Sequence, residues 1–247
     1  MYPIITPEDA ALDVLVIAVH PDDAELGCSG TVMRHIRDGK KVGIVDLTRG
    51  EMGTRGTAEI RLQESEVAAR ILGLHARENL GLRDGFFRNE EEEQIAIIRS
   101  IRHYKPRIVL ANAPVDRHPD HGRASRLISD ACFYSGLARI QTARDGNTQA
   151  AWRPSSIFHF VQSQSIPVDF VVDISDFWGR KIESIKAYRS QFWDPESKEP
   201  QTYISSENFM RMVEARAIEH GHIIGVRYGE GFVRQRVHGV NSLFDLI

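Results

Sequence analysis

The stretch LDVLVIAVHPDDAE, residues 12–25, carries most of the information about the fold. Its first half, residues 12–18, is an almost unbroken apolar run rich in β-branched side chains. Such a run is typical of a strand that is buried on both faces of a parallel sheet. His20, Asp22 and Asp23 follow it at once. An imidazole and two adjacent carboxylates are therefore expected where a strand ends and a helix begins.

A second polar cluster, RHPDHG at residues 117–122, follows another apolar run at residues 107–113. In an open parallel sheet, ligands bind beyond the carboxyl ends of the strands, where the strand order reverses. If the two strands are neighbours across that point, both clusters meet in one place. Two clusters of His and Asp residues at strand ends together indicate a hydrolytic metal site.

The rest of the chain alternates strand and helix patterns. Strands are expected over residues 12–18, 41–47, 108–113, 156–161 and 170–174, with a last one at a sheet edge over 226–237. Helices are expected over residues 24–37, 57–72, 90–104, 120–135, 175–190 and 205–220. Residues 136–156 lose this periodicity, and they either cover the site or contact a partner chain. We predict one α/β domain over residues 1–247, with a Rossmann-like, mostly parallel sheet and helices on both faces.

The composition favours an enzyme that acts on a small molecule. A net charge of −3 argues against a nucleic-acid-binding protein, because such domains are usually basic. No apolar run approaches the roughly 20 residues that span a membrane, and residues 1–13 lack the pattern of a signal peptide. Cys28 and Cys132 lie far apart and are expected to be small buried residues in a reducing compartment. We therefore expect a cytoplasmic protein.

Two imidazoles and one carboxylate with an open fourth position form a common catalytic zinc site, and the same ligand types also serve iron(II) and manganese. The remaining polar groups are then free for chemistry. One of Asp22 and Asp23 is expected to bind the metal while the other acts as a general base on a water molecule. His118 is suited to hydrogen-bond or protonate an oxyanion, and Asp120 either orients an imidazole or caps a helix. The residues alone leave open which aspartate and which of His118 and His121 binds the metal.

HPDDAE at residues 20–25, together with HPDH at residues 118–121, resembles the zinc-dependent PIG-L/LmbE-like N-deacetylases, which remove acetyl groups from N-acetylglucosaminyl compounds. Further stretches look like the bacillithiol-biosynthesis branch of that family: DLTRGEMGTRGT (46–57), ENLGLRDGFF (78–87), PVDRHPDHG (114–122), YRSQF (188–192) and GVRYGEGF (225–232). The resemblance implies hydrolysis of N-acetyl-α-D-glucosaminyl L-malate to glucosaminyl malate and acetate.

The resemblance also implies a role for each residue of the two clusters. It assigns His20, Asp23 and His121 to zinc and Asp22 to the general base. His118 takes the part that stabilises the oxyanion or protonates the leaving amine. Close members of the family are described as hexamers, so a homo-oligomer is implied as well.

The loop at residues 48–57 is expected to select the substrate. It combines three glycines with two arginines, whose planar donors suit a carboxylate or a phosphate. For a malate conjugate, Arg55 is the first candidate to pair with the malate carboxylates and Arg117 is the second. Arg49 is a further candidate, and Glu51 is a candidate for hydrogen bonds to sugar hydroxyls.

Three other functions compete with this interpretation. Two are enzymes of the same family: a deacetylase of another N-acetylglucosaminide, such as a chitobiose-type sugar or an antibiotic intermediate, or an amidase that cleaves mycothiol-type conjugates. The third belongs to a different class, a catalytically silent module that binds a metal or a nucleotide. Release of acetate by the zinc-loaded protein separates the enzymes from the silent module.

Overall fold

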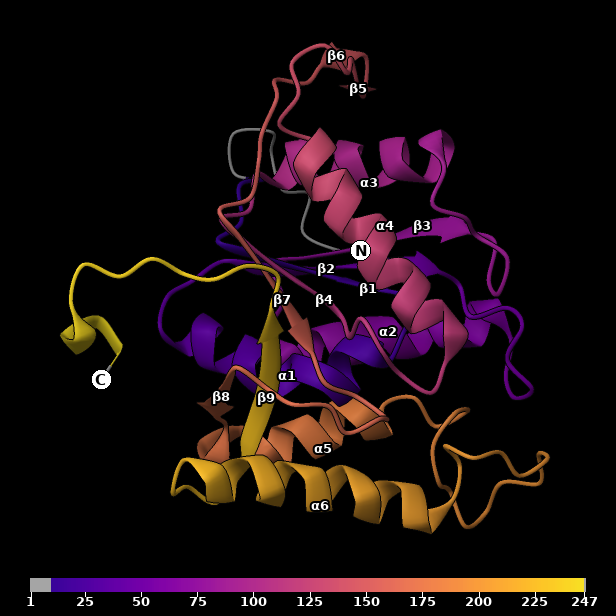
Figure 1. Ribbon diagram of the computed structural model, residues 1–247. Coiled ribbons are helices and arrows are strands. Elements are labelled where there is room, and N and C mark those ends of the chain that lie inside the picture. The colour runs from indigo at the N-terminus through magenta and orange to yellow at the C-terminus, as the bar shows by residue number, and fades with distance from the viewer. Residues whose placement is uncertain (1–9, 247) are drawn as a thin grey trace.

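The computed structural model describes residues 10–246 and is built around one seven-stranded sheet (Figure 1). The strand order is β3-β2-β1-β4-β7-β9-β8. Its members are β1 (Val14–Ala18), β2 (Val42–Thr48), β3 (Ala76–Leu82), β4 (Ile108–Asn112), β7 (Ser156–Phe160), β8 (Phe170–Asp173) and β9 (Gly229–Arg234). The neighbours β3, β2, β1, β4 and β7 pair in parallel, and β9 pairs antiparallel with both β7 and β8. The predicted α/β fold with a mostly parallel sheet is confirmed.

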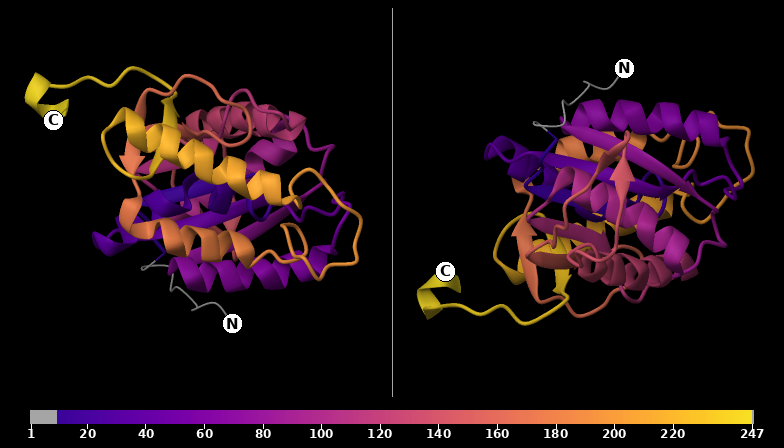
Figure 2. Two further views of the ribbon diagram at one scale, coloured as in Figure 1. Left: turned by 90° about the horizontal axis from the view of Figure 1, so that it is seen from below. Right: turned by 90° about the horizontal axis from the view of Figure 1, so that it is seen from above.

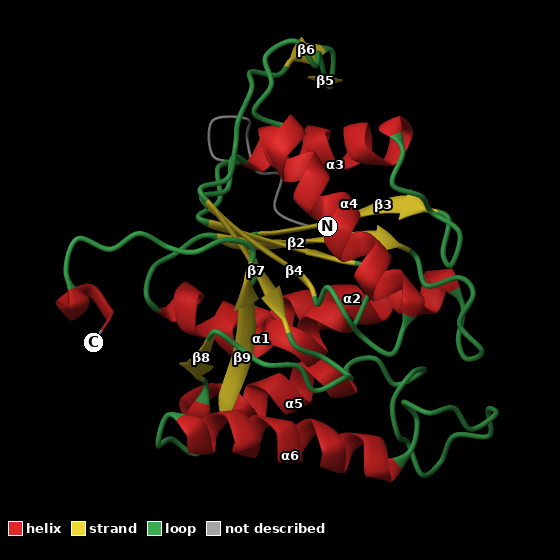
Figure 3. Cartoon of the chain, in the orientation of Figure 1, coloured by secondary structure: helices red, strands yellow, loops and turns green. Residues whose placement is uncertain are grey.

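Helices cover both faces of the sheet (Figures 1 and 3). They are α1 (Asp23–Arg37), α2 (Ala58–Leu72), α3 (Glu91–Tyr104), α4 (Pro119–Tyr134), α5 (Trp178–Lys186) and α6 (Glu207–Ile223). One face packs against α3 and α4, and the other packs against α1 and the end of α2. Outside this second layer, α5 packs against α1 and α2, while α6 packs against β9, as the two further views make clear (Figure 2).

The apolar run that opens the chain forms the centre of the core. Along β1, Leu15 and Ile17 point into the cluster with α3 and α4. Val14, Val16 and Ala18 point to the opposite face, into the cluster with α1. Successive side chains of a strand alternate between faces, so a strand that is covered on both sides must be apolar at every position.

The position of β1 also decides where the two His clusters meet. It lies between β2 on one side and β4 on the other, with parallel pairing to both. The strand order therefore reverses between β1 and β4, which is the point where ligands bind in sheets of this kind. The loops that follow β1 and β4 carry the two clusters, and the structure brings them together at one edge as expected.

Strand β3 was not predicted from the sequence, because the polar residues 77–79 and Gly81 interrupt its apolar side chains. The structure gives the reason. The side chain of Arg77 is buried and donates hydrogen bonds to both oxygens of Asp46 at 2.8 and 3.0 Å and to Glu25 Oε1 at 2.6 Å. Arg77, the centre of a buried ion network, thus takes a position where an apolar side chain would have completed the pattern of a buried strand.

The last strand lies inside the sheet and not at its edge, so the expectation for residues 226–237 was wrong on this point. Glu230 of this strand stabilises helix α1. The carboxylate accepts hydrogen bonds from the backbone N–H groups of Gly30 and Thr31 at 3.0 and 2.7 Å, and from Lys181 Nζ at 2.7 Å. These two N–H groups follow a break in α1 at Cys28, so Glu230 caps the second part of that helix.

Two other segments differ from expectation in detail. The helix expected over 175–190 is a 3-10 turn (Ser175–Phe177) followed by α5, which ends at Lys186. Residues 136–156 include a short hairpin of β5 (Ala143–Arg144) and β6 (Asn147–Thr148). The backbone of the excursion accepts hydrogen bonds from Arg102 of α3, and none of its residues lines the cavity described below. The excursion therefore does not cover the site.

Among the described residues, no helix has the length and apolar character needed to cross a membrane. Most of the N-terminal stretch in which no signal peptide was expected lies outside the described residues.

The buried ion network gives a test of the fold. We expect Arg77→Gln to lower the free energy of unfolding by roughly 3–5 kcal/mol, because two carboxylates would stay buried without their counter-charge. Urea-induced unfolding followed by circular dichroism measures this. The control is Arg126→Gln, since Arg126 pairs with Asp130 at the surface and its loss should cost about 0.5 kcal/mol or less. Equal, small effects of the two substitutions would contradict the role of Arg77.

Candidate metal centre and active site

A cavity of about 400 Å³ opens at the carboxyl ends of β1 and β4. It collects residues from loops that lie far apart in the sequence. The polar side chains among its lining residues include His20, Asp22, Asp23, Arg55, Arg61, Asp84, Arg117, His118, His121 and Gln162. Most of the residues predicted for the site are therefore brought together in one place.

Asp23 lies between two imidazoles at the base of this cavity. Its Oδ2 is 3.4 Å from His20 Nδ1, and its Oδ1 is 3.2 Å from His121 Nε2. One ligand atom from each of the three side chains lies within 4.8 Å of the others. Two imidazole nitrogens and a carboxylate at this spacing fit a catalytic zinc site, which takes three protein ligands and keeps one position open.

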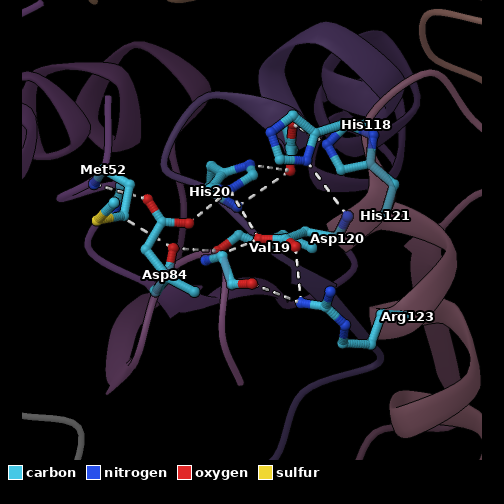
Figure 4. A network of polar contacts seen from close by, with 12 residues as sticks. Val19, His20, Met52, Asp84, His118, Asp120, His121 and Arg123 are labelled. Atoms are coloured by element: carbon cyan, nitrogen blue, oxygen red, sulfur yellow. Dashed lines mark hydrogen bonds and ion pairs between the residues drawn. The ribbon is translucent and has the colours of Figure 1, made fainter. Parts of the chain in front are cut away.

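The other nitrogen of each imidazole is held by a second carboxylate. His20 Nε2 lies 3.0 Å from Asp84 Oδ1, and His121 Nδ1 lies 2.5 Å from Asp116 Oδ2. Asp84 is itself fixed by the backbone N–H of Met52 at 3.0 Å (Figure 4). Metal-binding histidines almost always bond through their outer nitrogen in this way, which fixes the ring orientation and makes the inner nitrogen a better ligand.

Asp23 is fixed by further groups that the sequence did not single out. The amide of Asn112, at the end of β4, donates to Oδ2 at 3.2 Å. The amide of Gln162, just after β7, donates to Oδ1 at 2.5 Å. The backbone N–H of His20 donates to Oδ2 at 3.0 Å. The carboxylate is therefore held in one orientation by the ends of three neighbouring strands.

A second grouping, His20 with His118 and Asp120, also has suitable spacing. Its carboxylate is already engaged, however. Asp120 Oδ1 pairs with Arg123 Nη1 at 2.8 Å, and Oδ2 accepts from the backbone N–H of Gly85 at 2.9 Å (Figure 4). Asp120 lies 3.8 Å from His20 Nε2, the nitrogen that Asp84 holds at 3.0 Å. The set of His20, Asp23 and His121 is the better fit to a metal.

Asp22 has an unusual backbone. Its φ of 131° lies in the region that side chains other than glycine rarely adopt, a conformation that costs about 1–3 kcal/mol and is typical of active sites. Its Oδ2 accepts a hydrogen bond from Arg61 Nη2 at 2.9 Å. Burial raises the pKa of Asp22 to about 7, although the nearby Arg61 opposes the shift. The carboxyl group is thus suited to exchange a proton near neutral pH.

Charge compensation in this buried site depends on the imidazoles. Burial alone would lower the pKa of His121, but Asp23 and Asp116 raise it to about 9. The pKa of His20 is likewise raised well above its usual value, because the nearby carboxylates of Asp120, Asp23 and Asp84 outweigh burial. The pKa of Asp23 is held well below its usual value by His121 and His20, against the effect of burial. A divalent cation would supply the same positive charge and release the protons.

His118 differs from the other two imidazoles. Burial and the neighbouring His20 and His121 lower its pKa, so the ring is neutral. Its Nδ1 accepts from the backbone N–H of Asp120 at 3.3 Å, as expected for the residue that precedes α4. The ring proton therefore lies on Nε2, where it is available as a hydrogen-bond donor.

The four candidates for substrate binding divide into two pairs. Arg55 and Arg117 line the cavity, and Arg117 stacks on the ring of Tyr203 at 4.4 Å. Arg49 and Glu51 are not among the lining residues. The carboxylate of Glu51 instead accepts from the backbone N–H of Asp84 at 2.9 Å, so it supports the loop that holds His20.

Comparison with known proteins gives two informative sequence relatives. Diacetylchitobiose deacetylase from Thermococcus kodakarensis is 31% identical over 232 residues, which cover 88% of this chain and 81% of that protein. A probable N-acetyl-α-D-glucosaminyl L-malate deacetylase 2 from Bacillus anthracis is 26% identical over 192 residues, which cover 72% of this chain and 81% of that protein.

Two solved structures resemble the fold closely. The conserved protein TT1542 from Thermus thermophilus matches with a TM-score of 0.80 at 37% identity, over 93% of this chain and 98% of that one. The N,N′-diacetylchitobiose deacetylase from Pyrococcus horikoshii, complexed with its inhibitor MPG, matches with a TM-score of 0.78 at 28% identity, over 98% of this chain and 91% of that one.

The family model described as PIG-L, GlcNAc-PI de-N-acetylase, matches residues 15–132, a range that contains both His clusters. The relatives named above support the same assignment along most of the chain. This protein belongs to the PIG-L family and is a deacetylase, a hydrolase of N-acetyl amides.

Proposed function

We propose that this protein is a zinc-dependent deacetylase that hydrolyses the N-acetyl group of N-acetyl-α-D-glucosaminyl L-malate. One observation supports this reaction above all. His20, Asp23 and His121 form a possible metal site, and a buried Asp22 and a neutral His118 lie beside it. The stretches that resemble the bacillithiol branch and the two arginines of the cavity support the malate conjugate as substrate. The hexamer and the cytoplasmic location stay predictions from the sequence.

His20 Nδ1, the carboxylate of Asp23 and His121 Nε2 would hold the metal, since these atoms face one another while Asp84 and Asp116 hold the outer nitrogens. A bound zinc ion would lower the pKa of a water molecule and polarise the acetyl carbonyl group. Iron(II) and manganese accept the same ligand types, so the choice of zinc as the bound metal is itself a proposal.

Asp22 would carry out the proton transfers, and His118 would stabilise the developing negative charge. Asp22 would accept the proton of the attacking water, a task to which a carboxylate with a pKa of about 7 is matched. Arg61, at 2.9 Å, keeps that carboxylate oriented. His118, with its proton on Nε2, would hydrogen-bond the oxygen on which negative charge develops. The proton taken up by Asp22 would then pass to the leaving amine.

The aglycone determines which N-acetylglucosaminide is used. Arg117 is exposed and Arg55 is buried, and both line the same cavity as the proposed metal ligands. Guanidinium groups pair well with the two carboxylates of a malate group. A diacetylchitobiose-type sugar is the second candidate, and it is favoured by the 31% identity to the Thermococcus kodakarensis enzyme. That substrate has no carboxylate for these arginines.

The metal set is tested by a pair of histidine substitutions. We expect His121→Ala to lose stoichiometric zinc, because it removes a ligand, whereas His118→Ala keeps one zinc per chain and loses most of its turnover. Elemental analysis of the purified variants measures the metal content. Full zinc content in His121→Ala, or loss of zinc in His118→Ala, would refute this assignment.

The general base is tested at Asp22. We expect Asp22→Asn to retain zinc and to lower kcat by about 10²–10⁴-fold, because the amide cannot accept the proton of water. Acetate release gives the rate and elemental analysis gives the metal content. Asp176→Asn, which changes an exposed carboxylate paired with Arg37, is the control and should behave as the wild type. A fully active Asp22→Asn enzyme would exclude Asp22 as the base.

The substrate is tested by measuring acetate release from three compounds: N-acetyl-α-D-glucosaminyl L-malate, methyl N-acetyl-α-D-glucosaminide and N,N′-diacetylchitobiose. We expect the malate conjugate to have the highest kcat/KM. Arg117→Ala should raise KM for that conjugate about tenfold or more, since it removes a charge-assisted hydrogen bond, and should change KM for the neutral glycoside about twofold at most. A preference for diacetylchitobiose that Arg117→Ala does not alter would favour the second candidate.

A further inference from the structure

A carboxylate of the chain itself already occupies the neighbourhood of Arg55. It belongs to Glu199, in the segment of residues 194–204 that connects α5 to α6, called here the strap (the orange loop at the right of Figure 1). The end of the strap forms one wall of the cavity, through Thr202, Tyr203 and Ile204. The strap thus touches the same arginine that the substrate is proposed to use.

The contacts of Glu199 describe a site built for a carboxylate. Its Oε2 accepts a hydrogen bond from the backbone N–H of Gly56 at 3.0 Å and lies 3.5 Å from Arg55 Nε. The guanidinium of Arg55 also donates to Ser197 Oγ at 2.5 Å. The Arg55 side chain is only 4% exposed, and among the described residues its Nε has no hydrogen-bond partner. A buried guanidinium with an unused N–H group is a costly arrangement unless a ligand completes it.

We propose that Arg55 and Gly56 form a carboxylate subsite for the anionic aglycone of the substrate, and that Glu199 fills this subsite until the aglycone displaces it. This inference rests on the proposed function, because it takes a malate-type dicarboxylate as the aglycone. Exchange of one carboxylate for another leaves the charge of the subsite unchanged. It also makes the strap a part of substrate selection, since a neutral aglycone has nothing with which to displace Glu199.

The exchange is physically feasible because Glu199 is weakly held. Its side chain is 43% exposed, so its carboxylate returns to water at little cost. Ion pairs with an exposed partner are worth only about 0–1 kcal/mol. An aglycone carboxylate that reaches Arg55 Nε within normal hydrogen-bond distance would make a better contact than the present 3.5 Å.

The second anchor of the strap is also an arginine of the cavity. Tyr203 lies with its ring 4.4 Å from the guanidinium carbon of Arg117, a cation–π contact at the cavity mouth. A dicarboxylate would engage Arg117 with its other carboxylate. Both arginines that contact the strap are therefore groups that the aglycone would use. Binding should loosen the part of the strap around Glu199, while Tyr203 still packs on Phe209 and Ile204 on the apolar cluster around it.

The test uses L-malate as the probe and calorimetry as the measurement. Glu199→Gln removes the competing charge, so we expect it to bind L-malate about two- to fivefold more tightly than the wild type, as the loss of a partly exposed ion pair implies. Glu196→Gln is the matched control: Glu196 lies on the same strap, and among the described residues its side chain has no ion pair or hydrogen bond. An unchanged or weaker affinity in Glu199→Gln, or an equal gain in Glu196→Gln, would overturn the proposal.

A second measurement follows the strap itself. Amide hydrogen exchange in the part of the strap around Glu199 should become faster when the wild type is saturated with L-malate, and already be fast in Glu199→Gln without it. Unchanged exchange on malate binding would contradict displacement of Glu199.

Turnover separates this inference from the proposed function. In Glu199→Gln, the ratio of KM for methyl N-acetyl-α-D-glucosaminide to KM for the malate conjugate should rise. If the conjugate is hydrolysed but this ratio and the malate affinity stay unchanged, the subsite is wrong and the function stands. If malate displaces Glu199 but the conjugate is not hydrolysed, the subsite stands and the proposed function fails.

Discussion

Asp23 holds a carboxylate between two buried imidazoles, and the rest of the site depends on keeping that arrangement in place. Four more carboxylates surround it, on Asp22, Asp84, Asp116 and Asp120. Buried negative charge at this density is stable only with positive charge among it. In the protein alone, the raised pKa values of His20 and His121 provide that charge as protons. A divalent cation at the same point, as proposed, would account for the convergence of so many acidic groups there.

Buried ion pairs and hydrogen bonds beneath the site also help to keep Asp23 and its neighbour Asp22 in place. Glu25 lies two residues after Asp23 and is tied through Arg77 to Asp46 of β2, so the first turn of α1 is anchored to two strands. Glu230 caps the same helix beyond its break. The strained backbone of Asp22 is therefore held from both sides, by the sheet below and by the rest of α1. This anchoring places one aspartate toward the imidazoles and its neighbour toward Arg61.

Much of this could be predicted from the sequence because it depends on local pattern. The apolar run before His20 and the one before His118 predict buried strands, and the rule for parallel sheets then predicts that their ends form one site. Asp84 and Arg61 were not predicted, because each acts through a contact with a residue that is far away in the sequence. Asp116 lies only five residues before His121, but nothing in the pattern around it singled it out. The strap is similar: nothing in the sequence around Glu199 indicates that its carboxylate meets Arg55. Strand β3 was missed for a related reason: Arg77 stands where the pattern of a buried strand calls for an apolar residue, and its partner Asp46 lies on another strand.

The proposed mechanism depends above all on a catalytic zinc ion held by His20 Nδ1, Asp23 and His121 Nε2. The most direct test is a crystal structure of the zinc-loaded protein with an anomalous difference map measured at the zinc absorption edge. We expect a single strong peak about 2.0–2.2 Å from these three ligand groups, with His118 outside the coordination sphere. A peak bound by His118 and Asp120, or no peak at this edge of the sheet, would contradict it.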